Sequence, residues 1–263
     1  MKFLKNKYGI NEESKLFDLK FNENLSLNIR SELDSKGYCL IRNVYDRQRV
    51  ETIKRYLTGI LNGSLPNYHL LEENCPNFFR INFDDQRSTV QTKSVQFNFF
   101  PWNQDFCGFF EHFGSLFEIR DRINEITSPP LGAPKTNSTT GLISRLAVQF
   151  YPAGGGYLQA HSDPIGTHQM IIANVVMSEY GVDYTEGGLF IKNSFNSSKE
   201  YPEREGKTGD VILFKADMVH GVDPIDPCEK FDPLRGTGRW MMLSAITKPS
   251  GSDVINNSKT YDN

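Results

Sequence analysis

The stretch 209–222, GDVILFKADMVHGV, contains two short apolar runs separated by a polar turn. Apolar, β-branched runs of this length, bounded by Gly, Asp or Lys, are typical of strands rather than of helices. The same pattern recurs through the second half of the chain, in 143–151, 168–177, 187–192 and 238–247. Several short strands at this spacing predict a sandwich or barrel of the jelly-roll type.

The first half of the chain has a different pattern, in which apolar residues recur at helical spacing. Segments 23–36, 46–62 and 106–126 each carry such an apolar stripe. Asp46 stands where a helix cap is expected, and a short strand is predicted at 38–44. The first half is therefore expected to be helical with some strand.

These patterns predict a mainly β protein with helices, of the α+β class. A helix-rich part over 1–132 is expected to pack on a jelly-roll, cupin-like core over 133–248 as one domain. A polar stretch at 193–207 is expected to be an exposed loop, and 249–263 a flexible tail.

Composition excludes several classes of protein. The 263 residues carry 29 Lys and Arg against 32 Asp and Glu, so the formal net charge of −3 gives no strong field for nucleic acid or an anionic membrane. The chain has no apolar run long enough to span a bilayer, and its start does not resemble a signal peptide. We expect a cytoplasmic protein whose scattered cysteines are reduced thiols: Cys39, Cys75, Cys107 and Cys228.

The motif His161-Ser162-Asp163 is a candidate half of a metal site. Residues two apart on an extended chain point to the same face, so the imidazole and the carboxylate can meet. His220 follows in a predicted strand, and a jelly roll can bring it back beside the motif. Two histidines and a carboxylate on one side of a metal suit non-haem Fe(II). The alternative is a solvated His–Asp pair in a surface loop.

In its second half the sequence resembles the Fe(II)- and 2-oxoglutarate-dependent dioxygenases, which are double-stranded β-helix enzymes, and specifically the phytanoyl-CoA hydroxylase and prolyl hydroxylase type. The resemblance covers roughly 143–247. The motifs that carry it are H-S-D at 161–163, G-G-L-F-I at 187–191, G-D-V-I-L-F at 209–214, H-G-V at 220–222 and G-R-W at 238–240.

The resemblance implies that His161, Asp163 and His220 bind the iron, and that an arginine grips the far carboxylate of 2-oxoglutarate. Arg239 suits the second role because it opens a predicted strand, and guanidinium binds a carboxylate through two parallel hydrogen bonds. Its distance of 19 residues from His220 exceeds the family's usual spacing, which a loop at 224–236 would explain. Arg235, within that loop, is the competing candidate.

The resemblance also implies the chemistry. Fe(II), 2-oxoglutarate and O₂ together would oxidise a C–H bond of a substrate, with release of succinate and CO₂. Related halogenases have a small residue in place of the metal-binding carboxylate, so that chloride can bind. The presence of Asp163 favours hydroxylation or another oxygenase outcome, such as desaturation.

Five further residues are weaker candidates. Gln149 and Tyr151 alternate along one face of a predicted strand and could hydrogen-bond the keto acid, or could simply face solvent. Arg145, on the same face, could meet a substrate anion. His168 could be an outer partner of the metal site or an ordinary histidine at the start of a strand. Trp102 lies in an aromatic cluster that could wall the pocket or pack in the core.

We therefore expect an enzyme that oxidises a small metabolite, with an amino acid or small polar acid as first choice of substrate. No nucleic-acid or membrane partner is expected, and the oligomeric state stays open. Two alternatives remain: a metal enzyme of the same fold that does not use 2-oxoglutarate, and a non-catalytic jelly-roll protein that binds a ligand.

Overall fold

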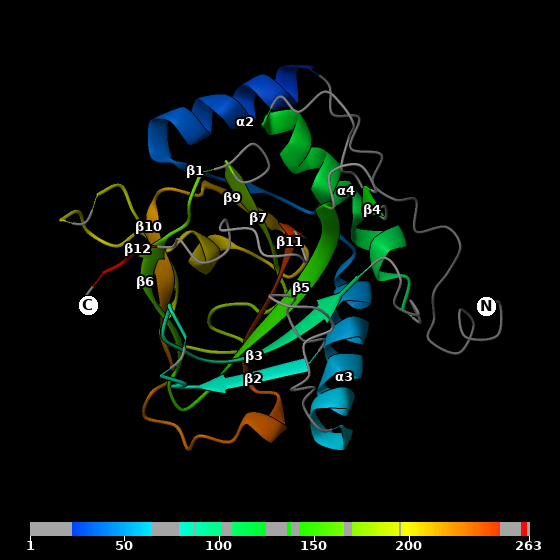
Figure 1. Cartoon of the computed structure of the whole chain (residues 1–263), viewed down its shortest axis with the longest axis vertical. Coiled ribbons are helices and arrows are strands. Elements are labelled where there is room, and N and C mark those ends of the chain that lie inside the picture. Colours follow the sequence, from blue (N-terminus) through cyan, green and yellow to red (C-terminus); the bar gives the residue numbers. More distant parts are fainter. Residues whose placement is uncertain are drawn as a thin grey trace.

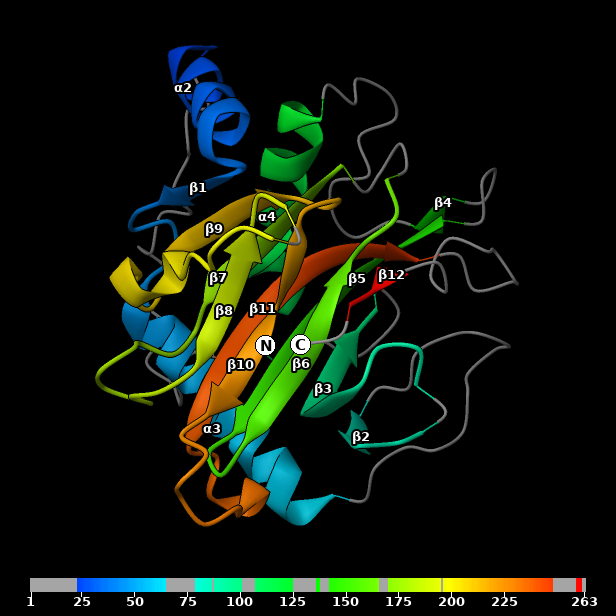
Figure 2. The same cartoon turned by 90° about the vertical axis from the view of Figure 1, so that its left-hand side faces the viewer.

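The described strands form one curled antiparallel sheet, with helices against one outer face (Figures 1 and 2). This computed structural model describes residues 23–64, 79–86, 88–100, 107–124, 136–137, 142–165, 170–194, 196–247 and 259–261. Along the sheet the strand order is β1-β9-β7-β11-β5-β3-β6-β10-β8, and β2, β4 and β12 pair with β3, β5 and β6 respectively.

The longest strands, β5 and β11, occupy the middle of the sheet. β11 pairs with β5 over its whole length and with β7 on its other side, so it joins two segments that are earlier in the chain. The bounds of the strands in the order above are β1 Tyr38–Ile41, β9 Val211–Lys215, β7 Ile171–Val176, β11 Gly238–Thr247, β5 Leu142–Pro152, β3 Thr92–Phe99, β6 Gly156–Ser162, β10 Val219–Ile225 and β8 Gly188–Lys192.

Packing shows that the sheet curls until its two ends meet. Leu189 of β8, at one end of the strand order, belongs to the same buried cluster as Ile212 of β9, near the other end. Val176 of β7 completes this contact between the opposite walls. The sheet therefore encloses an interior between its walls, as a double-stranded β-helix does, and the jelly-roll prediction is confirmed.

The three described helices cover the outer face of the wall formed by β7, β11 and β5. Their apolar stripes pack on outward-facing residues of these strands, among them Val148, Phe150 and Trp240, in the largest buried cluster. Asp46 caps α3 as predicted, because its side chain accepts a hydrogen bond from the Arg49 N–H at 2.8 Å. The bounds are α2 Glu23–Lys36, α3 Arg47–Gly63 and α4 Phe109–Ile123.

The sheet includes two strands from the first half of the chain, β2 and β3, that the sequence did not predict. β3 lies between β5 and β6, and β2 (Phe79–Phe83) pairs with it. The apolar residues of β3, such as Phe97, face the helices, whereas Gln96 and Asn98 on the alternate positions face the interior. The remaining elements are short: β4 Thr136–Asn137, β12 Lys259–Thr260, and the 3₁₀ turns η1 Pro202–Glu205 and η2 Pro233–Arg235.

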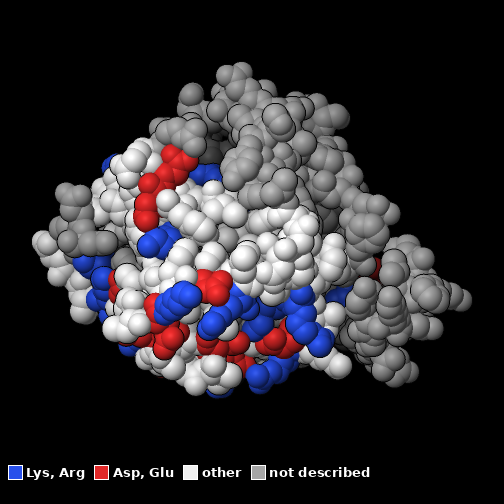
Figure 3. Space-filling model, turned by 90° about the horizontal axis from the view of Figure 1, so that it is seen from below, with Lys and Arg blue, Asp and Glu red and all other residues white. Residues whose placement is uncertain are grey.

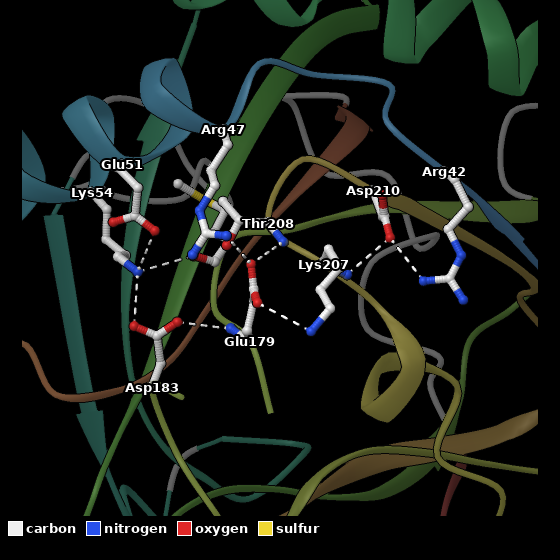
Figure 4. Close-up of polar contacts among 10 residues, drawn as sticks. Arg42, Arg47, Glu51, Lys54, Glu179, Asp183, Lys207, Thr208 and Asp210 are labelled. Carbon is white, nitrogen blue, oxygen red and sulfur yellow. Dashed lines mark hydrogen bonds and ion pairs between the residues drawn. The ribbon is translucent and has the colours of Figure 1, made fainter. Parts of the chain in front are cut away.

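A chain of ion pairs ties α3 to the loop between β7 and β8 (Figure 4). Lys54 of α3 lies 3.1 Å from the Asp183 carboxylate, and that carboxylate in turn accepts the Glu179 N–H at 2.7 Å. Glu179 is buried and pairs with Arg47 and Lys207. This network anchors the segment next to Tyr184, which belongs to the site described below.

Charges of both signs lie side by side on the face seen in Figure 3. Within the described residues, no helix is long and apolar enough to cross a membrane.

Candidate functional site: a histidine–carboxylate triad beside a buried arginine

The two predicted metal-binding histidines lie directly opposite each other on neighbouring strands. His161 of β6 and His220 of β10 are register partners in an antiparallel pair, and their ring centroids are 4.2 Å apart. Both are buried, with exposed fractions of 6% and 5%. The chain between positions 161 and 220 thus returns to a strand beside β6, as predicted from the spacing.

Each imidazole is fixed by a hydrogen bond to a main-chain carbonyl. The Nδ1 atom of His161 lies 2.9 Å from the Gln159 oxygen, and that of His220 lies 2.9 Å from the Met218 oxygen. A carbonyl oxygen can only accept, so Nδ1 carries the proton in both rings and each Nε2 keeps its lone pair. Metal-binding histidines are typically held in this way.

Asp163 completes the cluster just after the end of β6. Its two carboxylate oxygens lie 3.7 Å from the Nε2 atoms of His161 and His220, one oxygen to each ring, and its N–H donates to the Ala216 oxygen at 2.9 Å. The possible ligand atoms of all three residues lie within 4.8 Å of one another. A separation of 3.7 Å is too long for a hydrogen bond but close enough for one ion to bridge. We call these three residues the triad.

The pKa of His220 is lowered to about 4, mainly by burial and also by the nearby His161, while Asp163 opposes the change. His220 is therefore neutral at pH 7, which is the form that binds a metal. Two imidazoles and one carboxylate on one side of a point form the donor set that suits non-haem Fe(II). The residues present therefore fit the metal that the sequence implies.

Arg239, which was expected to bind the keto acid, is buried and already paired. Its Nε lies 2.6 and 2.9 Å from the two Glu203 carboxylate oxygens, and its Nη2 lies 2.7 Å from Oε2. Both side chains are buried, with exposed fractions of 3% and 5%. The bidentate geometry predicted for a keto-acid carboxylate is thus made with a carboxylate of the chain itself.

The Glu203 carboxylate accepts further hydrogen bonds from two neighbours. Oε1 accepts from the Tyr184 hydroxyl at 2.5 Å and from the Leu189 N–H at 2.9 Å. Burial alone would raise the pKa of Glu203, but the charge of Arg239 and these hydrogen bonds lower it below its usual range. The pKa of Arg239 is raised, because the effect of Glu203 outweighs that of burial. Both groups are therefore charged.

The pair lies on the same inner side of the sheet as the triad. Leu189, whose N–H donates to Glu203, is two residues along β8 from Ile191, the register partner of His220. Two residues of a strand span about 6.6 Å. Val222, two residues after His220, packs in one buried cluster with Tyr151 and Tyr184, which border the pair.

The predicted alternation along β5 is present in the structure. Leu146, Val148 and Phe150 pack toward the helices, so Arg145, Gln149 and Tyr151 face the interior. The Tyr151 hydroxyl donates to the Gln149 side chain at 2.6 Å, and Arg145 donates to the Asn98 side chain at 3.2 Å. Polar groups of β3 and β5 thus line this inner face.

The other candidates lie elsewhere. Arg235 is in η2, with a side chain 68% exposed and paired with Asp232, so it is remote from the inner face that Arg239 occupies. His168 and Trp102 lie outside the described residues. Phe97 and Phe99, from the same aromatic cluster as Trp102, pack in the core against the helices.

Glu203 was missed because its stretch, 193–207, was expected to be an exposed loop. That expectation is wrong at Pro202 and Glu203, which are both buried in η1. The surrounding Ser, Asn, Lys and Glu residues give no apolar period that marks an inward turn. Arg239 could have indicated the presence of Glu203, since an arginine that binds a ligand inside the fold is buried, and a buried charge needs a partner of opposite sign.

The segment expected to be a flexible tail, 249–263, contains three described residues that belong to the sheet. β12 pairs with β6, with Thr260 opposite His161 and Lys259 opposite Ser162. The Tyr261 N–H donates to the Ala160 oxygen at 2.9 Å. The strand that carries His161 is therefore covered at this edge by a late part of the chain.

Fold and triad together define a double-stranded β-helix protein with a candidate metal centre. Comparison of the sequence with family models and with curated proteins gives no match. Comparison of the structure does: a prolyl-4-hydroxylase of Pseudomonas putida superposes with a TM-score of 0.51 at 14% identity, over 83% of this chain and 96% of that one.

A second similar structure is a prolyl hydroxylase from Trichoplax adhaerens, in complex with a peptide fragment of the hypoxia-inducible factor oxygen degradation domain. Its TM-score is 0.53 at 15% identity, over 90% of this chain and 94% of that one. At such identities the likeness establishes the fold. This chain has the fold of the prolyl hydroxylases, so the resemblance inferred from the sequence is confirmed at that level.

Proposed function

We propose that this protein is an Fe(II)- and 2-oxoglutarate-dependent oxygenase that oxidises a C–H bond of a small molecule. The observation that carries the proposal is the triad: two imidazoles held in the metal-binding tautomer, with a carboxylate facing both Nε2 atoms at 3.7 Å. A single ion bound by three ligands on one side retains further coordination positions for other ligands.

Bound iron, 2-oxoglutarate and O₂ would supply oxidative decarboxylation and the oxidation of a C–H bond. The chain's own residues provide the surroundings. His161, Asp163 and His220 hold and orient the metal, and the buried strands around them exclude water. Arg239 is a cation on the inner face that can meet the far carboxylate of the keto acid, and Gln149 and Tyr151 offer polar atoms on the same face.

An amino acid or small polar acid is the proposed class of substrate. The inner face beside the site presents Arg145, Gln149, Gln96 and Asn98, and the Gln96 amide donates to the Asn98 oxygen at 3.1 Å. Such a face favours a ligand with hydrogen-bonding groups and negative charge over a purely apolar one.

The test combines metal binding with turnover. The protein is loaded with Fe(II) under anaerobic conditions, then supplied with 2-oxoglutarate, O₂ and panels of amino acids and small acids, and succinate is measured. We expect succinate release that depends on the metal and that His161→Ala abolishes. Ser162→Ala is the matched control, since this neighbouring hydroxyl contacts the Tyr261 hydroxyl at 3.3 Å and is not part of the triad.

Each outcome has one meaning. Metal-dependent succinate release that survives His161→Ala would contradict the triad as the metal site. Metal binding without binding of any keto acid would favour the metal enzyme that does not use 2-oxoglutarate. A protein that binds neither iron nor manganese would favour the non-catalytic ligand-binding alternative.

A further inference from the structure

The Glu203 carboxylate occupies the guanidinium that a dicarboxylic keto acid would need. It engages Nε and Nη2 of Arg239 in three contacts of 2.6 to 2.9 Å. Guanidinium presents its donors in a fixed planar fork, so two carboxylates cannot both use the same side of the fork. A 2-oxoglutarate molecule that reached Arg239 at these two nitrogens would therefore meet a site that is already filled.

Charge leads to the same conclusion. The buried pair is neutral as a whole, because one carboxylate balances one guanidinium. A second carboxylate brought to it would be a buried negative charge beside Glu203 with no cation of its own, and an uncompensated buried charge is strongly unfavourable. At Nε and Nη2, therefore, Glu203 must leave before the far carboxylate of a keto acid can bind Arg239.

The position of Glu203 in the chain allows such a movement. It lies in η1, a single 3₁₀ turn between β8 and β9 whose next side chain along, Glu205, is 82% exposed. The turn is held by few main-chain hydrogen bonds, among them Gly206 N–H to the Glu203 oxygen at 2.9 Å. A short turn next to solvent can open at a smaller cost than a strand of the sheet.

We propose that Glu203 is an internal competitor for the co-substrate: it holds Arg239 in the resting protein, and 2-oxoglutarate binds only when η1 opens and withdraws it. The inference rests on the proposed function and adds a determinant of co-substrate specificity to it. When only a small fraction of the protein has Glu203 displaced, the apparent affinity for 2-oxoglutarate is the intrinsic affinity multiplied by that fraction. A keto acid without the second carboxylate does not need to contact Arg239, so its apparent affinity is not reduced in this way.

The first test measures keto-acid binding to the Mn(II)-loaded protein by titration calorimetry. 2-Oxopentanoate is the matched ligand, since it has the five-carbon skeleton of 2-oxoglutarate without the far carboxylate. In Glu203→Gln we expect 2-oxoglutarate to bind about tenfold more tightly or better, because the competing charge is gone, whereas 2-oxopentanoate changes by less than about threefold. Glu205→Gln, in the same turn but exposed, should leave both affinities unchanged.

A second test uses the wild-type chain, so that it does not depend on folding of the variant. Amide hydrogen exchange is followed by NMR in the Mn(II)-free, Zn(II)-loaded protein with and without saturating 2-oxoglutarate. If Glu203 is withdrawn, the Gly206 amide loses protection on binding. The Ile191 amide, which donates to the Glu200 oxygen at 2.8 Å just before the turn, is the internal control and keeps its protection.

The outcomes separate this inference from the proposed function. If no keto acid binds the metal-loaded protein, the proposed function fails and this inference fails with it. If both keto acids bind but Glu203→Gln leaves 2-oxoglutarate affinity unchanged or weakens it, the inference alone is overturned, and Glu203 instead positions Arg239. Retained protection of Gly206 in the 2-oxoglutarate complex overturns it too.

Discussion

Two polar clusters face the same interior and are built on opposite principles. In the triad, the carboxylate stands 3.7 Å from each histidine, so the three groups approach one another without hydrogen bonding. In the Arg239–Glu203 pair, the contacts are 2.6 to 2.9 Å, and Tyr184 and Leu189 add two further donors. The triad is stabilised by an added cation. In the Arg239–Glu203 pair the two charges already balance each other, so a ligand that binds to either group must break existing contacts.

The contrast predicts that substitutions in the triad change ligand binding with little effect on folding stability, whereas substitutions that remove one charge of the pair change folding stability as well. The triad side chains make few mutual contacts that a substitution could remove. The pair consists of buried charges whose partners are fixed, so loss of either partner leaves the other uncompensated.

Asp163→Ala has the largest expected effect, and it falls on metal affinity. Loss of a direct ligand should weaken Mn(II) binding by more than the roughly 10–100-fold that removal of an outer partner of a ligand causes. The unfolding free energy of the metal-free protein should change by less than about 1 kcal/mol. Titration calorimetry and urea unfolding measure the two quantities. Unchanged Mn(II) affinity would show that Asp163 is not a metal ligand, and the contrast between the two clusters would then be wrong.

Arg239→Met is expected to cost about 3–5 kcal/mol of stability, because it leaves the buried Glu203 carboxylate without its cation. Combining it with Glu203→Leu should restore most of that loss, since two apolar side chains replace the two charges. Urea unfolding of the metal-free single and double variants checks both expectations. Wild-type stability in Arg239→Met would show that the buried Glu203 carboxylate does not depend on Arg239 for its charge compensation.

Tyr184→Phe tests one hydrogen bond of the pair. The hydroxyl donates to a charged, buried oxygen at 2.5 Å, so its removal should cost about 1.5–3 kcal/mol. Tyr180→Phe is the control, because the Tyr180 hydroxyl makes no hydrogen bond to the part of the chain that the structure describes. Equal losses in the two variants would mean that the cost reflects ring packing and not the bond to Glu203.

His112 extends the contrast to a buried imidazole that belongs to neither cluster. Its pKa is lowered to about 4, mainly by burial and also by the charge of Arg49, while Asp46 opposes the change. Its Nε2 is buried without a hydrogen-bond partner among the described residues. Since its pKa is lower in the folded than in the unfolded state, the unfolded state binds more protons below about pH 6.5 and stability falls as the pH falls.

The size of this effect is measured by comparison with His112→Leu. Between pH 7 and pH 5 the wild type should lose about 2 kcal/mol more stability than the variant. Urea unfolding across this range, on metal-free protein, provides the curves. Parallel curves would show that His112 does not govern the acid sensitivity.

The sequence predicted the parts of this molecule that repeat a simple period. The jelly roll followed from short apolar runs. The meeting of His161 with Asp163 followed from the i, i+2 rule, and that of His220 with both from the return of the chain. β3 was missed because it contains no continuous apolar run: its apolar residues alternate with inward polar ones, such as Gln96 and Asn98, a pattern that itself indicates a half-buried strand. Glu203 escaped because burial of one charged side chain in a turn depends on a partner 36 residues away.

The place of β11 between β7 and β5 has a consequence for how the chain acquires its structure during synthesis. β5 and β7 are translated long before β11, yet β11 is the strand that joins them. Until residues up to Thr247 have left the ribosome, the middle of the sheet is missing and the inward polar groups meet water. The sheet therefore cannot close until late in synthesis, and until then the strand edges of β5 and β7 that β11 covers are unpaired.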